Sequence, residues 1–260
     1  MRIPARITRI HLPLLAIALA TGACRDAAPR ATLTVSAAAS LRDVLAEAEQ
    51  RFERDNPGVD VRTNFGASGA LAAQIQQGAP VDVFISAAEG PMRRLEEAGL
   101  IDARSRRVLA GNELVLIAPA ADSGRVSRWE DLATPAVRQL SVGAPASVPA
   151  GEYAEDVFRT LGIRDTVMRK AVLAQDVRQV LAHVSAGEVD AGVVYRTDVP
   201  AAKGRVRVVA GAPAGSHRPS LYPVAVTAVT RQVEQARAYV AFLLGPQGRE
   251  LLRARGFRVD

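Results

Sequence analysis

From residue 33 onward, strand-type and helix-type segments alternate along the chain, and this alternation constrains the fold more than any other feature. Apolar, β-branched runs such as LTVSA (33–37) and VDVFISA (81–87) are typical of buried strands, whereas segment 41–54 carries apolar side chains at helical spacing. Short connections between alternating strands and helices favour largely parallel sheets covered by helices. The sequence therefore predicts an α/β fold.

The same patterns place the remaining elements. We expect strands at 33–37, 59–65, 81–87, 114–119, 140–145, 191–196, 206–210 and 222–229. We expect helices at 41–54, 71–77, 91–99, 151–161, 176–187 and 232–254, the last broken near Gly245-Pro246. A chain of 260 residues that is 48% hydrophobic is long enough for a packed core in one domain or two lobes.

The N-terminus has the features of a secretory signal. Three arginines precede an apolar run at 12–20 that is too short to span a bilayer. We therefore predict a signal peptide at 1–24, followed by a tether at 25–31. Removing the three arginines halves the formal net charge of +6. No stripe of basic and aromatic residues remains, so a nucleic-acid partner is not expected.

Two ways of processing this signal remain open. Ala18-Leu19-Ala20 is an A-x-A site for ordinary cleavage, whereas Thr21-Gly22-Ala23-Cys24 resembles a lipobox whose cysteine becomes lipidated. Cys24 is the only cysteine of the chain, so there is no disulfide, and a lone thiol in an exported protein is better explained by lipidation. We expect a protein of the periplasm or of the outer face of the cytoplasmic membrane, lipid-anchored at Cys24 or secreted.

Four strand-to-helix junctions carry similar chemistry, and ligands of open α/β sheets bind at such junctions. They contain Ser40, Ser68, the bare backbone at Ala150-Gly151, and Val177. Each has a simpler alternative: Ser40 and Asp43 resemble a capping box, Asp176 is a plausible N-cap, and the other two junctions are ordinary turns.

Together these junctions offer neutral donors, namely serine hydroxyls, backbone amides and helix N-termini. Arg42 and Arg178 lie one residue into their helices and are expected to point outward. Such a site suits a small, fully deprotonated oxyanion, which accepts hydrogen bonds and has none to donate.

The order of several motifs adds a family resemblance. AAASL (37–41), FGASGALAAQI (65–75), GAPVDVFISA (78–87), GNELVLIAP (111–119), VPAGEYA (148–154), AQDVR (174–178), GVVY (192–195) and YPVAV (222–226) occur in this order. The run resembles the molybdate-binding proteins of bacterial ABC importers. The resemblance implies a two-lobed type II periplasmic-binding-protein fold, with two crossing strands and a ligand cleft between lobes of 32–113 plus 223–260 and of 114–222.

The resemblance also implies a ligand set and partners. The residues that match the family's motifs are Ser40, Ser68, Ala150, Val177 and Tyr195. They would hold molybdate or tungstate, so that molybdenum enters only as the bound oxyanion and no cofactor is needed. The expected partners are a membrane permease and its ATPase, and we expect a monomer that is not an enzyme.

Two other function classes remain as alternatives. The first is a type II binding protein for sulfate, phosphate or an organic acid. The second is an exported serine hydrolase using Ser68, but its G-x-S-x-G motif fails at Ala70, and only His183 and His217 remain as bases after signal removal. Metal catalysis and nucleotide binding are not supported, because the chain contains neither an H-E-x-x-H motif nor a P-loop.

Overall fold

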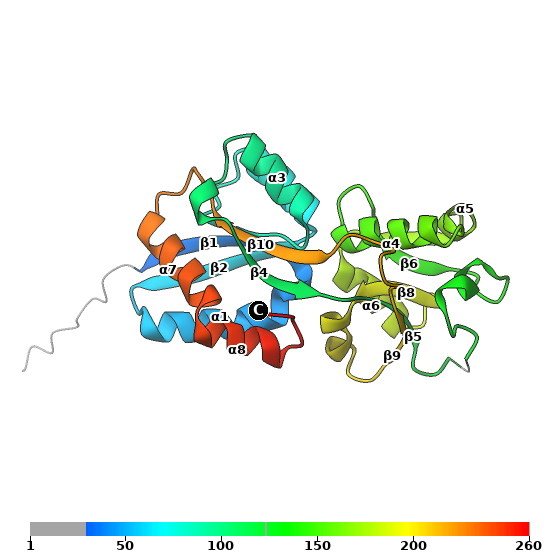
Figure 1. Ribbon diagram of the computed structural model, residues 1–260. Helices are drawn as coiled ribbons and strands as arrows, with labels where there is room; N and C mark the ends of the chain where they lie inside the picture. Colours follow the sequence, from blue (N-terminus) through cyan, green and yellow to red (C-terminus); the bar gives the residue numbers. More distant parts are fainter. Residues whose placement is uncertain (1–29, 123, 260) are drawn as a thin grey trace, which may run out of the picture.

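The computed structural model describes residues 30–122 and 124–259, which form two α/β lobes lying side by side (Figure 1). The predicted signal peptide, Cys24 and most of the predicted tether lie outside the described residues. Ala31 already belongs to the first strand, so the fold begins before the predicted tether ends. In the two described ranges, no helix is long and apolar enough to cross a membrane.

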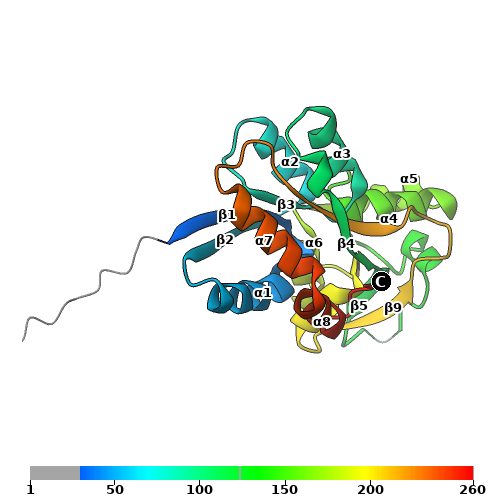
Figure 2. The same cartoon turned by 60° about the vertical axis from the view of Figure 1, so that its left-hand side comes forward.

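The first lobe is built on a five-stranded sheet of order β2-β1-β3-β10-β4. β1 runs parallel to β2 and β3, whereas β10 runs antiparallel to β3 and β4. Helices α2 and α3 lie on one side of this sheet and α1, α7 and α8 on the other (Figures 1 and 2). The elements are β1 (Ala31–Ala38), α1 (Arg42–Asp55), β2 (Val59–Gly66), α2 (Ser68–Gln76), β3 (Val83–Ile85), α3 (Glu89–Glu97), β4 (Arg107–Asn112), β10 (Ser220–Val226), α7 (Val233–Leu244) and α8 (Pro246–Ala254).

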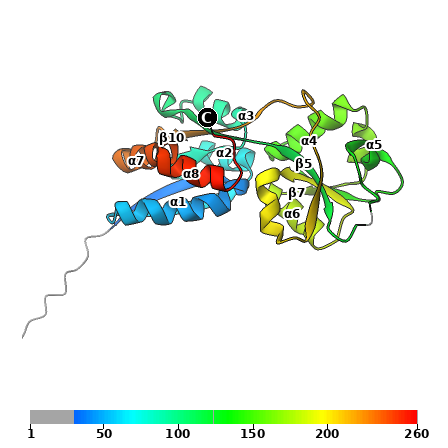
Figure 3. The ribbon, with the colours of Figure 1, turned by 60° about the horizontal axis from the view of Figure 1, so that its bottom comes forward.

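The second lobe repeats this plan with a sheet of order β7-β6-β8-β5-β9. β6 runs parallel to β7 and β8, and β5 runs antiparallel to β8 and β9. Helices α4 and α6 cover opposite faces of it (Figures 1 and 3). The elements are β5 (Leu114–Pro119), β6 (Leu140–Gly143), α4 (Pro149–Thr160), α5 (Arg164–Met168), β7 (Ala171–Ala174), α6 (Val177–Ser185), β8 (Ala191–Tyr195) and β9 (Val206–Gly211).

The chain crosses between the lobes twice. Only Glu113 separates β4 from β5, and residues 212–219 connect β9 to β10 (Figure 3). The sequence predicted the second boundary at 222/223, but β10 pairs with β4 from its first residue, Ser220. We propose that the second crossing is 212–219 and that the first lobe resumes at Ser220.

In helix α1 the apolar side chains that predicted a helix form its buried face. Val44, Leu45, Ala48 and Phe52 recur at helical spacing and all are buried. Phe52 packs edge-on against Tyr239 of α7, with ring centroids 5.1 Å apart, so α1 and α7 share one layer of the core. Burying side chains of this kind contributes about 1.5–3 kcal/mol for each large apolar group.

Three elements lie outside the predicted pattern: strands β4 and β7 and the short helix α5. β4 and β7 are edge strands, and each exposes an apolar side chain, Val108 and Leu173 respectively. Their sequences therefore lack the continuous burial that marked the other strands.

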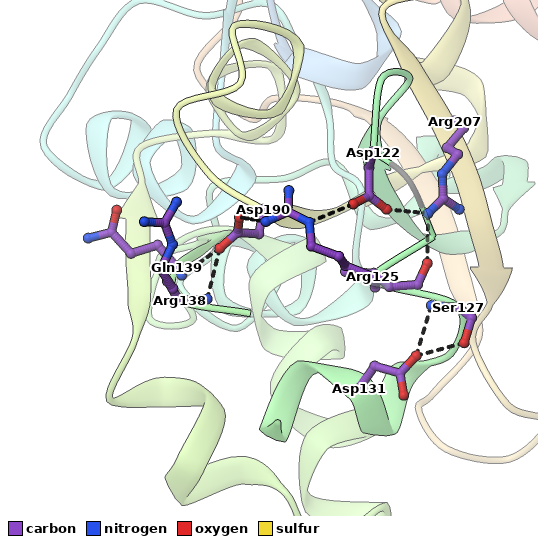
Figure 4. Close-up of polar contacts among 9 residues, drawn as sticks. Asp122, Arg125, Ser127, Asp131, Arg138, Gln139, Asp190 and Arg207 are labelled. Carbon is purple, nitrogen blue, oxygen red and sulfur yellow. Dashed lines mark hydrogen bonds and ion pairs between the residues drawn. The ribbon is translucent and has the colours of Figure 1, made fainter. Parts of the chain in front are cut away.

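A network of ion pairs and hydrogen bonds lies at the end of the second lobe that is distant from the first lobe (Figures 1 and 4). Asp122 pairs with Arg125 at 3.0 Å and with Arg207 at 2.5 Å. Asp190 pairs with Arg125 at 3.2 Å and accepts a hydrogen bond from the amide of Arg138 at 2.8 Å. All of these residues belong to the second lobe, so the network fastens the connection after β5 to the sheet.

Candidate functional site

A cavity lies between the lobes, where the carboxyl ends of β1, β2 and β8 meet the N-termini of four helices. About 220 Å³ of empty space lies between its walls, including the part that is open to solvent. All five of the residues predicted from the sequence line it and are buried. The lining consists of Ala38, Ala39, Ser40, Gly66, Ala67, Ser68, Val148, Pro149, Ala150, Asp176, Val177 and Tyr195.

Ser40 lies in a 3-10 turn, Ala39–Leu41, that leads into α1. The capping alternative for Ser40 is wrong: α1 has no side-chain cap, and the Oγ of Ser40 lies 2.9 Å from the hydroxyl of Tyr222 on β10. The turn takes over the start of the helix, because Arg42 bonds back to the carbonyl of Ala39. The Ser40 hydroxyl therefore remains at the cavity wall.

Ser68 is the first residue of α2, which begins three residues earlier than predicted. Its Oγ accepts a hydrogen bond from the backbone N–H of Ala87 at 2.9 Å, and the residue is fully buried. Ala87 follows β3, so the end of a third strand of the first lobe contributes to the site. No sequence pattern selected Ala87, although this residue also lies at the carboxyl end of a strand.

The second lobe contributes two helix N-termini. Ala150 is the second residue of α4, after Pro149, and Val177 is the first residue of α6. The carboxylate of Asp176 caps the amides of Arg178 and Gln179, as the N-cap alternative predicted, and it leaves the amide of Val177 uncapped. First-turn N–H groups have no partner inside their own helix, so both amides are suited to an anion.

Helix α4 reaches the cavity because two glycines allow close packing. A Cβ at Gly151 would lie 1.9 Å from the carbonyl oxygen of Gly143 on β6, and a Cβ at Gly143 would lie 2.3 Å from Val148. Any larger residue would push the start of α4 away from the sheet. The bare backbone of this junction therefore sets the position of Ala150.

Tyr195 ends β8 and is 1% exposed. Its hydroxyl donates to the carbonyl of Ala87 across the lobes at 3.4 Å. Burial raises the pKa of this phenol well above its ordinary value. The group therefore keeps its proton and is a hydrogen-bond donor.

The lobes are closed on each other around the cavity. The amide of Gly69 in the first lobe donates to the carbonyl of Ser147 in the second at 2.9 Å. The expectation that Arg178 points outward is wrong: its guanidinium reaches across to Asp43 at 2.5 Å and also pairs with the buried Asp198 at 2.9 Å. This arginine links the lobes at the cavity edge without lining the cavity.

The electrostatics of the cavity depend on dipoles. In the described part of the chain, its lining contains no lysine or arginine, and Asp176 is its only ionisable carboxylate. The helix N-termini present the positive ends of their dipoles to the cavity. This arrangement can solvate an anion without a counter-charge.

The two remaining histidines lie elsewhere in the second lobe. His183 Nδ1 lies 2.9 Å from Ser141 Oγ, and His217 Nδ1 lies 2.6 Å from the carbonyl of Arg218. A serine nucleophile needs a base within hydrogen-bond reach. Neither histidine is among the residues lining the Ser68 cavity, so the hydrolase alternative has no support in this geometry.

Two α/β lobes with a cavity of hydrogen-bond donors between them are typical of a solute-binding protein. Residues 33–258 match the family described as bacterial extracellular solute-binding protein. The chain belongs to this family.

One relative and two solved structures show which members of this family the chain is similar to. The chain is 38% identical to the molybdate-binding protein ModA of Escherichia coli (strain K12), over 94% of this chain and 95% of the relative. The solved periplasmic molybdate-binding protein of Azotobacter vinelandii matches with a TM-score of 0.78 at 25% identity, over 88% of this chain and 99% of that one. The sulfate-binding protein SubI of Mycobacterium tuberculosis H37Rv has a TM-score of 0.77 at 20% identity, over 89% and 88%, a likeness of fold alone.

Proposed function

We propose that this chain captures molybdate outside the cytoplasmic membrane and delivers it to an ABC importer. One observation carries the proposal: the five residues selected from the sequence, contributed by both lobes, line a single cavity whose lining has donors but no lysine or arginine. A fully deprotonated tetrahedral dianion matches such a lining. The relatives named for molybdate binding support this choice of ion.

The ligand shell is proposed as follows. Ser40 and Ser68 donate through their hydroxyls, and Ala150 and Val177 donate through their backbone amides. Tyr195 donates through its phenol, whose proton turns from the Ala87 carbonyl to the ion. Many oriented dipoles replace the water that the ion loses, which offsets the cost of burying its charge. No bond of the ligand is made or broken.

Capture follows from the division of this shell between the lobes. In an open form the two serines of the first lobe meet the ion first. Closure then adds the three groups of the second lobe, and the ion stabilises the closed form because it bridges both lobes. Tungstate has nearly the same size and charge, and we propose that it binds as well.

The partners and location are part of the same proposal. The closed form docks on a membrane permease driven by a cytoplasmic ATPase, and the protein works as a monomer. We propose that Cys24 is lipidated and holds the protein at the outer face of the membrane. Mass spectrometry of the mature N-terminus tests this, because an unmodified residue 21 or 25 at the N-terminus would contradict it.

Thermal melting of the mature chain, purified after export, tests the function with molybdate, tungstate, sulfate and phosphate. A ligand at about 1,000 times its dissociation constant stabilises the folded state by about 4 kcal/mol. We expect this shift with molybdate and tungstate, and its loss in a Ser40→Ala, Ser68→Ala double variant. Ser141→Ala is the control, since Ser141 is buried in the second lobe and does not line the cavity. A shift with sulfate alone would assign the protein to the sulfate alternative.

A further inference from the structure

The order of the strands shows on which side of the molecule the cavity opens. The two crossings join β4 and β10 of the first lobe to β5 and β9 of the second, and these strands lie at one edge of each sheet. β2 and β7 are the edge strands farthest from the crossings. Lobes that hinge at the crossings therefore separate most widely at the carboxyl ends of β2 and β7, which form the entrance to the cavity.

Arg42 lies at this entrance. It is the first residue of α1, and its guanidinium carbon lies 4.5 Å from the centroid of the Phe65 ring near the end of β2. Phe65 directly precedes Gly66, and Arg42 follows Ser40 by two positions; Gly66 and Ser40 both line the cavity. The Arg42 side chain is exposed, as the sequence predicted, and it lies beside the cavity without being part of its lining.

The positive charge of Arg42 is not neutralised by a carboxylate. Among the described residues its side chain has no ion-pair partner, and its contact is with the Phe65 ring. An aromatic face attracts a cation but carries no net charge, so this contact places the guanidinium without cancelling its charge. Arg178, the other arginine near the cavity, is in contrast paired with Asp198 at 2.9 Å and with Asp43 at 2.5 Å.

The contact between Arg42 and Phe65 lies within the first lobe, so it persists when the lobes separate. Ser40 and Ser68, which meet the ion first in the proposed capture, belong to the same lobe. Separation breaks the contact between Asp43 and Arg178 and leaves Asp43 without the one ion-pair partner that it has among the described residues. The free Asp43 carboxylate repels an anion, and the neighbouring charge of Arg42 offsets this repulsion.

We propose that Arg42 is a steering residue that speeds the capture of oxyanion dianions by the open form. Its charge attracts the ion through water toward the two serines, and such attraction raises association rates in a way that salt suppresses. Because Arg42 stands outside the cavity lining, it acts on the association rate and leaves the dissociation rate nearly unchanged. This inference rests on the proposed function, whose capture step it extends.

Stopped-flow fluorescence of the mature chain with molybdate measures the association rate constant, and displacement by excess tungstate measures the dissociation rate constant. Both are measured at about 0.01 M and about 1 M sodium chloride, where the Debye length is about 30 Å and about 3 Å. We expect Arg42→Gln to slow association by about three- to fivefold at low salt and by less than about 1.5-fold at high salt. A merely structural role would lower the rate equally at both salt concentrations.

Two further substitutions at this position separate charge from shape. Arg42→Lys keeps the charge and is expected to associate within about twofold of the wild-type rate. Arg42→Glu reverses the charge, so the effect of Arg42→Gln should be squared, to about 10- to 25-fold at low salt. A graded series from lysine to glutamine to glutamate is the signature of steering.

Arg54→Gln is the matched control. Arg54 is also exposed and lies in the last turn of the same helix, twelve positions from Arg42 and so about 18 Å farther along the axis. The variant loses the same unit of net charge, but at the end of α1 distant from the cavity. We expect its association rate to stay within about 1.5-fold of the wild type at both salt concentrations.

The outcomes distinguish this inference from the proposed function. If the wild type does not bind molybdate, the proposed function fails and the steering role falls with it. If the wild type binds molybdate but Arg42→Gln associates at the wild-type rate, or is slowed equally at both salt concentrations, the steering role is wrong while the proposed function stands. A salt-dependent loss in Arg42→Gln, restored in Arg42→Lys and absent in Arg54→Gln, establishes the role.

Discussion

The pKa values of two aspartates with arginine partners are shifted in opposite directions. Asp198 lies near the cavity, and Asp122 lies at the far end of the second lobe. Burial raises the pKa of Asp198 to about 7, although Arg178 opposes the change. Burial also disfavours the charge of Asp122, but hydrogen bonds from Arg207 and Arg125 outweigh it, and the pKa of Asp122 is lowered (Figure 4). Asp198 is fully buried, whereas Asp122 is a half-buried residue of a loop, so the depth of burial and the number of arginine partners together set the two directions.

The difference reflects what each group of contacts must do. Asp122 pairs with two arginines, of which Arg125 also pairs with Asp190, and its network never leaves one lobe. Asp198 shares a single arginine with Asp43 of the other lobe. Only the Arg178–Asp43 contact has to break when the lobes separate, because Arg178 and Asp198 both belong to the second lobe. Asp198 therefore shares its arginine in the closed form, whereas Asp122 keeps the same partners whether the lobes are open or closed.

The largest expected effect is on the pH dependence of the free energy of unfolding, to which the two aspartates contribute with opposite signs. The pKa of Asp198 is higher in the folded than in the unfolded chain, so its contribution is greatest below about pH 4 and is lost as the pH rises through about 7. A change from 3.8 to about 7 corresponds to about 4 kcal/mol at most. Asp122 has the opposite sign, and its contribution is lost as the pH falls below about 4.

Denaturant unfolding of the wild type, Asp198→Asn and Asp122→Asn between about pH 3 and 8 checks this. The stability of the wild type minus that of Asp198→Asn should fall across the range from pH 4 to 7. For Asp122→Asn the difference should fall only toward the acid end. If the two stability differences changed with pH in the same way, the two aspartates would not differ in the sign of their contribution.

Removing the arginines themselves should have the next largest effect. Arg178→Ala at about pH 8 leaves Asp198 buried without a cation and is expected to lower the free energy of unfolding by about 3 kcal/mol. Arg207→Ala leaves Asp122 with Arg125 and should cost about 1 kcal/mol. If denaturant unfolding gave the same decrease in free energy for both variants, sharing an arginine between two aspartates would make no difference to stability.

Gly69→Ala tests closure directly. A Cβ at Gly69 would lie 2.6 Å from the carbonyl oxygen of Ser147 in the other lobe. Overpacking of this kind costs about 1–3 kcal/mol, so molybdate affinity should fall by about 5- to 150-fold while the melting temperature without ligand stays near the wild type. Gly90→Ala is the control, because its nearest atom is 3.9 Å away in the side chain of Arg94. Unchanged affinity in calorimetry would show that the closed contact is dispensable.

Asp43→Asn should have the smallest effect. Asp43 is 43% exposed, and exposed pairs contribute about 0.2–1 kcal/mol, so we expect molybdate release to accelerate by up to about fivefold in a displacement experiment. Glu47→Gln on the same helix is the control, because its partners Arg51 and Arg255 belong to the first lobe. If Glu47→Gln accelerates release equally, the effect is one of general charge and not of the link between lobes.

Much of this architecture could be predicted because it is local. Strands β1, β3 and β8 are buried apolar runs, and α1 shows its core face in its spacing. The edge strand β4 was missed because half of its side chains face solvent or the crossing, which weakens any periodic signal. Four of the cavity residues lie at junctions selected by the rule that ligands bind at the carboxyl ends of strands, whereas Tyr195 was predicted from the family resemblance alone.

What could not be predicted depends on contacts between distant residues. Ser40 and Tyr222 are 182 positions apart, and no local pattern indicates that a serine before a helix will bond to a strand instead of capping. Arg178 looked like a solvent-facing helix residue because its partner Asp43 lies 135 positions away in the other lobe. Such pairs become visible only when the two lobes are seen closed.

The single residue between β4 and β5 has a further consequence. With only Glu113 in that crossing, few rotatable bonds separate the lobes there, while residues 212–219 provide slack on the other side. Glu113 is also clasped by Arg196 through two contacts of 2.7 and 2.8 Å. The lobes should therefore rotate about one axis at Glu113, so that the cleft opens on one side only. Inserting even a few glycines into this crossing should let the lobes adopt many relative orientations. The two walls of the cavity would then no longer meet in a single arrangement.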